Sequence, residues 1–84
     1  MSISEYKYDP KDFEGIPSMS DDLMAFYRAL EAYKSEKNSS NGFDLQDKIE
    51  NIELSIKHCT LNGDLNTSFA NELNDYIRGL LKDD

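Results

Sequence analysis

Residues 44–59, DLQDKIENIELSIKHC, decide the fold of this 84-residue chain. Their apolar side chains recur at alternating steps of four and three residues, which is the spacing of one face of an α-helix. The stripe consists of Leu45, Ile49, Ile52, Ile56 and Cys59. We expect Asp44 to cap the start of this helix. Asn62-Gly63 is expected to end it, because glycine readily takes the left-handed conformation at a helix C-terminus.

The same periodicity predicts one helix before this stretch and one after it. The first starts near Ser18 or Ser20 and runs to about Lys37, and the last starts at Asn66, Thr67 or Ser68 and continues almost to the chain end. The first stripe is Met19, Leu23, Phe26, Leu30 and Tyr33, widened by Met24 and Tyr27, and the last is Phe69, Leu73, Tyr76 and Leu80, broadened by Ile77 and Leu81. A turn is expected in residues 38–42, NSSNG, whose side chains compete for backbone hydrogen bonds. Gly79 either marks close approach of another backbone or, as we favour, the start of fraying.

Residues 1–17 are expected to form an extended arm, since Asp9-Pro10 and Ile16-Pro17 restrict the backbone and Gly15 loosens it. The arm is too apolar for a free tail, so it should pack on its own helices or on a neighbouring subunit. Its apolar residues are Ile3, Tyr6, Tyr8, Phe13 and Ile16.

The fold class predicted from these elements is all-α. Valine is absent, so the usual strand-forming residues are nearly missing. Short connections make neighbouring helices antiparallel, which gives a three-helix bundle or a helical hairpin over residues 18–84, with the arm at 1–17. Only 38% of the chain is hydrophobic. Such a thin core leaves completion of the fold by oligomerisation open.

The charge of the chain is strongly negative. The chain has nine Lys and Arg residues and 17 Asp and Glu residues, which gives a formal net charge of −8. No segment gathers enough cations to neutralise a row of phosphates, so direct binding to nucleic acid or to an anionic membrane is not expected. The same charge attracts a basic protein. We expect a cytoplasmic protein. The chain has one cysteine, and it shows neither an apolar run of membrane-spanning length nor the pattern of a signal peptide.

Catalytic and metal-binding patterns are missing. The single histidine, His58, precedes the single cysteine, Cys59, and adjacent residues on a helix point about 100° apart, so they cannot form a nucleophile–base pair. Zinc would need a second group of Cys or His. No glycine-rich phosphate loop is present. The sequence therefore predicts neither an enzyme nor a bound cofactor.

Tyrosine and phenylalanine exceed what three helical stripes need, and several lie beside carboxylates. Such a combination is typical of protein-binding surfaces, although mutual burial of the aromatics explains it equally well. The candidate partner-binding residues are Tyr6, Tyr8, Asp9, Asp12, Phe13, Glu14, Phe43, Asp44 and Asp47.

The function predicted from these features is that of a small acidic helical protein that blocks a protein target by occlusion. The target is expected to be basic or an enzyme, as for an immunity protein, an antitoxin or a phage-encoded inhibitor. The alternatives are a homo-oligomeric structural or regulatory module and a sponge for a small ligand, which would need cations such as Arg28 or Arg78.

Overall fold

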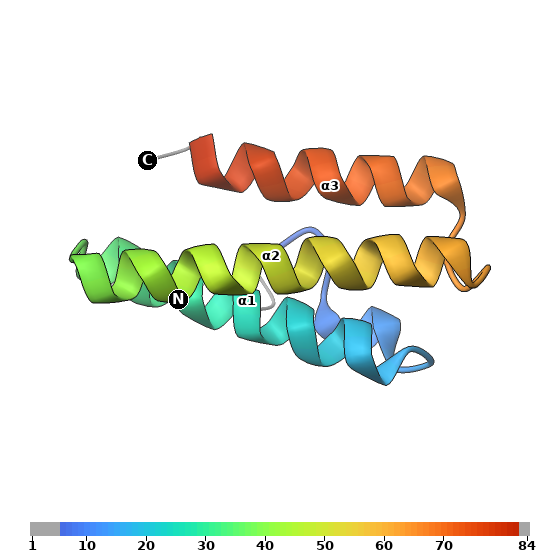
Figure 1. Ribbon diagram of the computed structural model, residues 1–84, viewed down its shortest axis with the longest axis horizontal. Coiled ribbons are helices and arrows are strands. Elements are labelled where there is room, and N and C mark those ends of the chain that lie inside the picture. Colours follow the sequence, from blue (N-terminus) through green and yellow to red (C-terminus); the bar gives the residue numbers. More distant parts are fainter. Residues whose placement is uncertain (1–5, 83–84) are drawn as a thin grey trace.

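The computed structural model describes residues 6–82 and is helical throughout its regular parts (Figure 1). In chain order its elements are the 3-10 helix η2 (Pro10–Phe13) and the α-helices α1 (Pro17–Ser35), α2 (Ser39–Leu61) and α3 (Thr67–Lys82). Residues 6–82 contain no strand. The prediction of an all-α chain is confirmed.

The three α-helices run up, down and up along the long axis of an elongated body of 37 × 22 × 21 Å. Figure 1 shows α2 between α1 and α3, antiparallel to both neighbours as expected from the short connections. All three helices share one core, so the fold is a three-helix bundle rather than an isolated hairpin.

Most of the core comes from the predicted apolar stripes, together with Phe13 from η2 and the small residues Ala29 and Ala70, whereas Tyr76 of the predicted third stripe is only half-buried. Burial of this apolar surface is the main favourable term in folding. The most deeply buried side chains, with exposures of 0–1%, include Met19, Leu23, Phe26, Tyr27 and Leu30 of α1, Ile52 and Ile56 of α2, and Leu73 and Ile77 of α3.

The start of α1 and the start of α2 both differ from the prediction. Helix α1 begins at Pro17, without a side-chain cap, rather than at Ser18 or Ser20. Proline suits the first position of a helix because a backbone N–H there has no partner within the helix, so the N–H that proline lacks is not needed. Helix α2 begins at Ser39 instead of Asp44, because the Asn38 side chain accepts a hydrogen bond from the Asn41 N–H at 2.8 Å. Residues 38–42 therefore cap and begin a helix rather than form a turn.

The other helix ends follow the prediction more closely. Helix α2 ends at Leu61, and Gly63 takes the left-handed conformation with φ 83°. Helix α3 begins at Thr67, within the predicted range, and Asn66 accepts a hydrogen bond from the Ser68 N–H at 2.8 Å. Neither interpretation of Gly79 is confirmed. The helix continues through it to Lys82, and a Cβ added there would meet no atom within 4 Å.

The N-terminal segment docks on the bundle, but it is not uniformly extended. Asp9 and Asp12 form a capping box, and Pro10 occupies the first turn of η2. These local features favour a helical turn where the prediction had an extended arm, which was therefore wrong for residues 10–13. Phe13 is 6% exposed and contributes to the core. Residues 1–5, including Ile3, lie outside the described part of the chain.

Tyrosine residues fasten this segment to α1 and to α3. The Tyr6 and Tyr27 rings are stacked with centroids 4.0 Å apart, and the Tyr27 hydroxyl donates to the Tyr8 carbonyl at 2.6 Å. On the other side, the Lys7 backbone N–H donates to the Tyr76 hydroxyl at 2.8 Å, and the Tyr8 ring meets the Tyr76 ring edge-on. The segment thus joins the first and third helices of its own domain.

Candidate protein-binding surface

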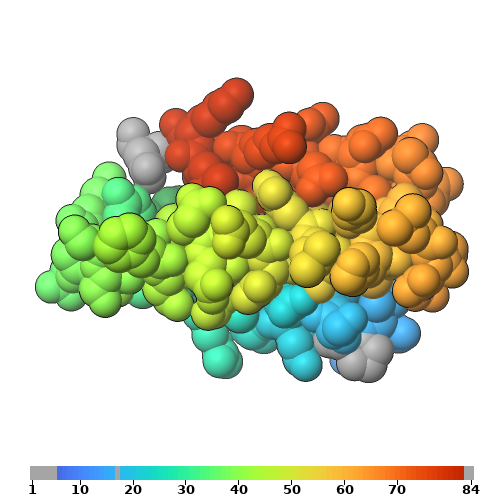
Figure 2. Space-filling model, in the orientation of Figure 1, coloured from blue at the N-terminus to red at the C-terminus, as the bar shows by residue number. Residues whose placement is uncertain are grey.

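The large apolar side chains that stay exposed in the described part of the chain all belong to α2. Phe43, Leu54 and Leu61 are 76%, 51% and 74% exposed. Their separations of eleven and seven residues correspond to about three and two helical turns, so the three side chains leave the helix on one side. At about 1.5 Å per residue the line they form is about 27 Å long. Figure 2 shows α2 running the length of the molecule on the side in view.

Charged side chains occupy the positions between these apolar residues. Asp47, Glu50 and Lys57 are exposed. Taken in order with the three apolar residues, they occupy positions 43, 47, 50, 54, 57 and 61, which are separated by steps of four, three, four, three and four residues. We call this set the α2 face. It consists of Phe43, Asp47, Glu50, Leu54, Lys57 and Leu61.

The N-terminal half of the α2 face is acidic. Lys48 lies beside it and contacts Asp44 at 3.2 Å and Asp47 at 3.3 Å. Hydrogen bonds to Asp44 and then to Asp47 raise the pKa of Lys48. Because both carboxylates are exposed to water and Lys48 is only half-buried, the pairs stabilise the helix only slightly. Two carboxylates share a single ammonium group, so this half of the α2 face retains net negative charge.

Each end of the α2 face borders a shallow hollow. At the N-terminal end, Phe43 lines a hollow of about 520 Å³ beside the connection between α1 and α2, with Tyr33 and Gln46 among its other walls. At the C-terminal end, Leu61 and Lys57 line a groove of about 280 Å³ between α2 and α3. The apolar ends of the α2 face therefore lie beside concave surface that a partner side chain can enter.

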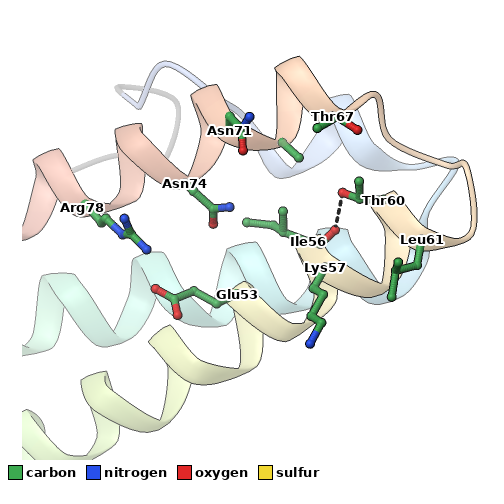
Figure 3. A pocket seen from close by; sticks show the side chains of 10 residues that line it. Glu53, Ile56, Lys57, Thr60, Leu61, Thr67, Asn71, Asn74 and Arg78 are labelled. Atoms are coloured by element: carbon green, nitrogen blue, oxygen red, sulfur yellow. Dashed lines mark hydrogen bonds between the residues drawn. The ribbon is translucent and has the colours of Figure 1, made fainter.

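The groove between α2 and α3 has polar walls and an apolar floor (Figure 3). Its floor includes Ile56 and Ala70, both buried, and the small side chain of Ala70 leaves the space open. Asn74 and Arg78 of α3 face Glu53 of α2 across it. Of the two cations named for the small-ligand alternative, Arg78 lines this groove. Arg28 is exposed on α1 and lines neither hollow.

The residues predicted to bind a partner do not form one surface. Those from the N-terminal segment lie beside α1, away from the first turns of α2 (Figure 1). Phe13 is buried, and Tyr6 and Tyr8 are half-buried against their own helices, so mutual burial explains these three aromatics. Asp9 and Asp12 cap η2, and Glu14 is exposed. Phe43, Asp44 and Asp47 are exposed together on α2.

Sequence reasoning missed Glu50, Leu54, Lys57 and Leu61. Their signal was present in the spacing. Phe43 and Leu61 are 18 residues apart, which is five full turns, and Leu54 lies about 20° from both around the helix axis. The buried stripe of this helix gives no sign of them, because they lie on its opposite side.

The single histidine and the single cysteine lie in the last turns of α2. Residues 6–82 contain no group of three or more His, Cys, Asp and Glu side chains placed to hold a metal ion. Cys59 is buried and unpaired, and desolvation raises the pKa of its thiol. Its neighbour His58 is exposed. A buried, protonated thiol is a poor nucleophile.

Within residues 6–82, no helix is both long enough and apolar enough to cross a membrane. Comparison of the chain with protein-family models, with curated proteins and with solved structures finds no match.

Proposed function

We propose that this chain is a small protein-binding module that inhibits a protein target by covering part of its surface with the α2 face. The observation that carries the proposal is the alignment of Phe43, Leu54 and Leu61, all exposed, along one side of one helix. Large apolar side chains that project from one side of an exposed helix, with charged residues between them, suit the binding of that helix in a groove of a partner. Burying them against a partner recovers free energy that folding leaves unused.

The shape of the α2 face suits a cleft on the target. A single exposed helix is convex, and such helices bind by laying an apolar side into a groove of the partner. The rest of the bundle would then stand over the mouth of that groove. This arrangement blocks access to the target without any chemistry, in keeping with an immunity protein, an antitoxin or a phage-encoded inhibitor. A reducing cytoplasm suits its single, unpaired thiol.

The charge of the chain favours a basic target. A net charge of −8 accelerates encounter with a cationic surface at low salt, and the exposed carboxylates of Asp47 and Glu50 lie between the apolar anchors. When Phe43 and Leu54 contact the target, lysine or arginine side chains of the target would lie beside these carboxylates. Charge of this kind contributes more to the rate and specificity of association than to affinity.

Two charge-matched double variants test the proposal. Asp47→Asn with Glu50→Gln alters the α2 face, and Glu72→Gln with Asp75→Asn alters exposed positions of α3. Each pair removes two negative charges, so long-range attraction to a basic target weakens equally. We expect the α2 pair alone to lose retention of a specific partner captured from the source organism, and Leu54→Ser to weaken that complex by about tenfold or more.

The controls separate binding from folding. Circular dichroism and thermal melts should leave both double variants close to the parent chain, because all four positions are exposed. Equal loss of the partner in both double variants would mean that only net charge matters, and full retention in the α2 pair and in Leu54→Ser would place the binding surface elsewhere. Either result would overturn the proposal.

A further inference from the structure

We propose that, without a target, the α2 face pairs in antiparallel register with the α2 face of a second copy of the chain. The face would then be covered in the free protein, and a target would compete with the second copy for it. The inference goes beyond the proposed function, because it depends only on the order of side chains along α2.

The spacing of the α2 face is that of a heptad seam. Steps of four, three, four, three and four residues keep six exposed positions on one side of a helix, as in coiled coils. The seam is short and only half apolar. Two such seams can still pack side by side if each charged position meets a suitable position of the partner.

An antiparallel arrangement satisfies most of these positions. When Phe43 lies opposite the partner's Leu61, the two-fold axis crosses the helix pair at the level of residue 52. Asp47 then lies opposite the partner's Lys57. Symmetry repeats both layers at the other end, as in any isologous interface. The pair therefore has apolar layers at both ends and opposite charges in the layers next to them.

The two central layers place Glu50 opposite the partner's Leu54. The side chain of Glu50 is exposed and long enough for its methylene groups to cover a leucine while its carboxylate stays in water. In the same register the partner's Lys57 is one turn further along the helix, within reach of that carboxylate. The central layers thus leave no charge buried without a partner.

Parallel pairing of the same faces is unfavourable. It would set Asp47 against the partner's Asp47, Glu50 against the partner's Glu50 and Lys57 against the partner's Lys57. Like charges at facing positions are destabilising in helical pairs, and they decide both orientation and choice of partner. The order of charges along α2 therefore selects the antiparallel arrangement.

The net charge of each copy limits the strength of this pairing. Two bodies of charge −8 repel each other at low ionic strength. At physiological ionic strength the screening length is about 8 Å, so distant charges are largely screened while the contacts between Asp47 and the partner's Lys57 are retained. We therefore expect a weak and reversible dimer, which forms at moderate salt and dissociates when salt is removed.

A charge exchange tests the register with the full chain. Sedimentation equilibrium at physiological salt should show a mass that rises towards two copies as the protein concentration increases. Asp47→Lys should abolish this rise, because two lysines then face each other at each end of the interface. Asp47→Lys combined with Lys57→Asp should restore it, because the exchange rebuilds the opposite-charge pair.

Asp75→Lys is the matched control, since it makes the same change of charge at an exposed position of α3 and should leave the dimer intact. A strictly monomeric parent chain would overturn the inference, and so would an exchange variant that stays monomeric while Asp75→Lys dimerises. A chain that remains monomeric yet captures its target through the α2 face would remove the self-pairing and leave the proposed function standing.

Discussion

Replacement of Tyr27 by phenylalanine tests how the N-terminal segment is held on the bundle. The Tyr27 side chain is 0% exposed, its ring stacks on Tyr6, and its hydroxyl donates to the Tyr8 carbonyl at 2.6 Å. Tyr27→Phe keeps the ring and its packing and removes only the oxygen atom. The Tyr8 carbonyl then loses this donor within a partly buried site.

The expected loss is about 1–2 kcal/mol in the free energy of unfolding. The net contribution of one hydrogen bond to the free energy of unfolding is about 0.5–1.5 kcal/mol, and a buried acceptor left without its donor costs about 1–3 kcal/mol. In a domain of this size each kcal/mol lowers the Tm by roughly 4–8 °C. Urea unfolding followed by circular dichroism should therefore show a lower midpoint with an unchanged slope.

Tyr33→Phe is the matched control. Tyr33 is half-buried on the same helix, and its hydroxyl has no hydrogen-bond partner among the described residues, so its loss should change stability by less than about 0.5 kcal/mol. Equal stability of the two variants would refute the account of the segment, because it would mean that the contact between Tyr27 and Tyr8 is not formed in solution.

The pH dependence of stability provides a second readout of the same contact. Burial, followed by the nearby Tyr76 and Tyr6, raises the pKa of Tyr27 well above its ordinary value. The folded state therefore holds the neutral hydroxyl more tightly than the unfolded state does. This contribution is complete below about pH 10 and declines as pH rises further. In Tyr27→Phe the decline attributable to this group should be absent from alkaline unfolding curves.

Three further substitutions and one labelling experiment test the local structure. Asn38→Ala should cost about 1 kcal/mol, because it removes the N-cap of α2, and hydrogen exchange should show the first turn of that helix opening more readily. Gly63→Ala should destabilise by about 1 kcal/mol, since its φ is 83°, whereas Gly79→Ala in α3 should stabilise by up to about 1 kcal/mol. Paired thermal melts that move in the same direction would contradict this explanation. Cys59 should react with a thiol reagent far more slowly in the folded than in the urea-unfolded chain, and equal rates would mean that it is not buried.

The sequence was sufficient for most of the core, because helical periodicity depends on local spacing alone, but it did not place Phe13 there. Ile52, Ile56 and Leu73 are buried where their stripes predicted. Helix starts were harder to predict, since the side chains that make turns also cap helices. Asn38 could be assigned to either role until its hydrogen bond to the Asn41 N–H was known. The 3-10 turn at residues 10–13 was missed for a similar reason, because Pro10 is compatible with a turn and with an extended chain.

The candidate site was predicted only in part. Phe43, Asp44 and Asp47 were chosen because aromatic and acidic residues adjoin in the sequence, and they are exposed together on α2. The same reasoning chose Tyr8 and Phe13, which pack into their own domain. Composition cannot distinguish an aromatic residue that binds a partner from one that fills the core, because the distinction depends on which helices lie beside it. The long-range contacts to Tyr76 and Phe69 decide the matter here.

The most direct measurement of the central claim, that the α2 face is where this chain contacts other proteins, is site-specific photo-crosslinking in the source organism. A photoreactive amino acid at position 54 would lie in the middle of the α2 face, and one at position 75 would lie at an exposed position of α3. The account predicts discrete covalent adducts from position 54, either with a target or with a second copy, and none of comparable yield from position 75. Adducts from position 75 alone, or of equal yield from both positions, would contradict it.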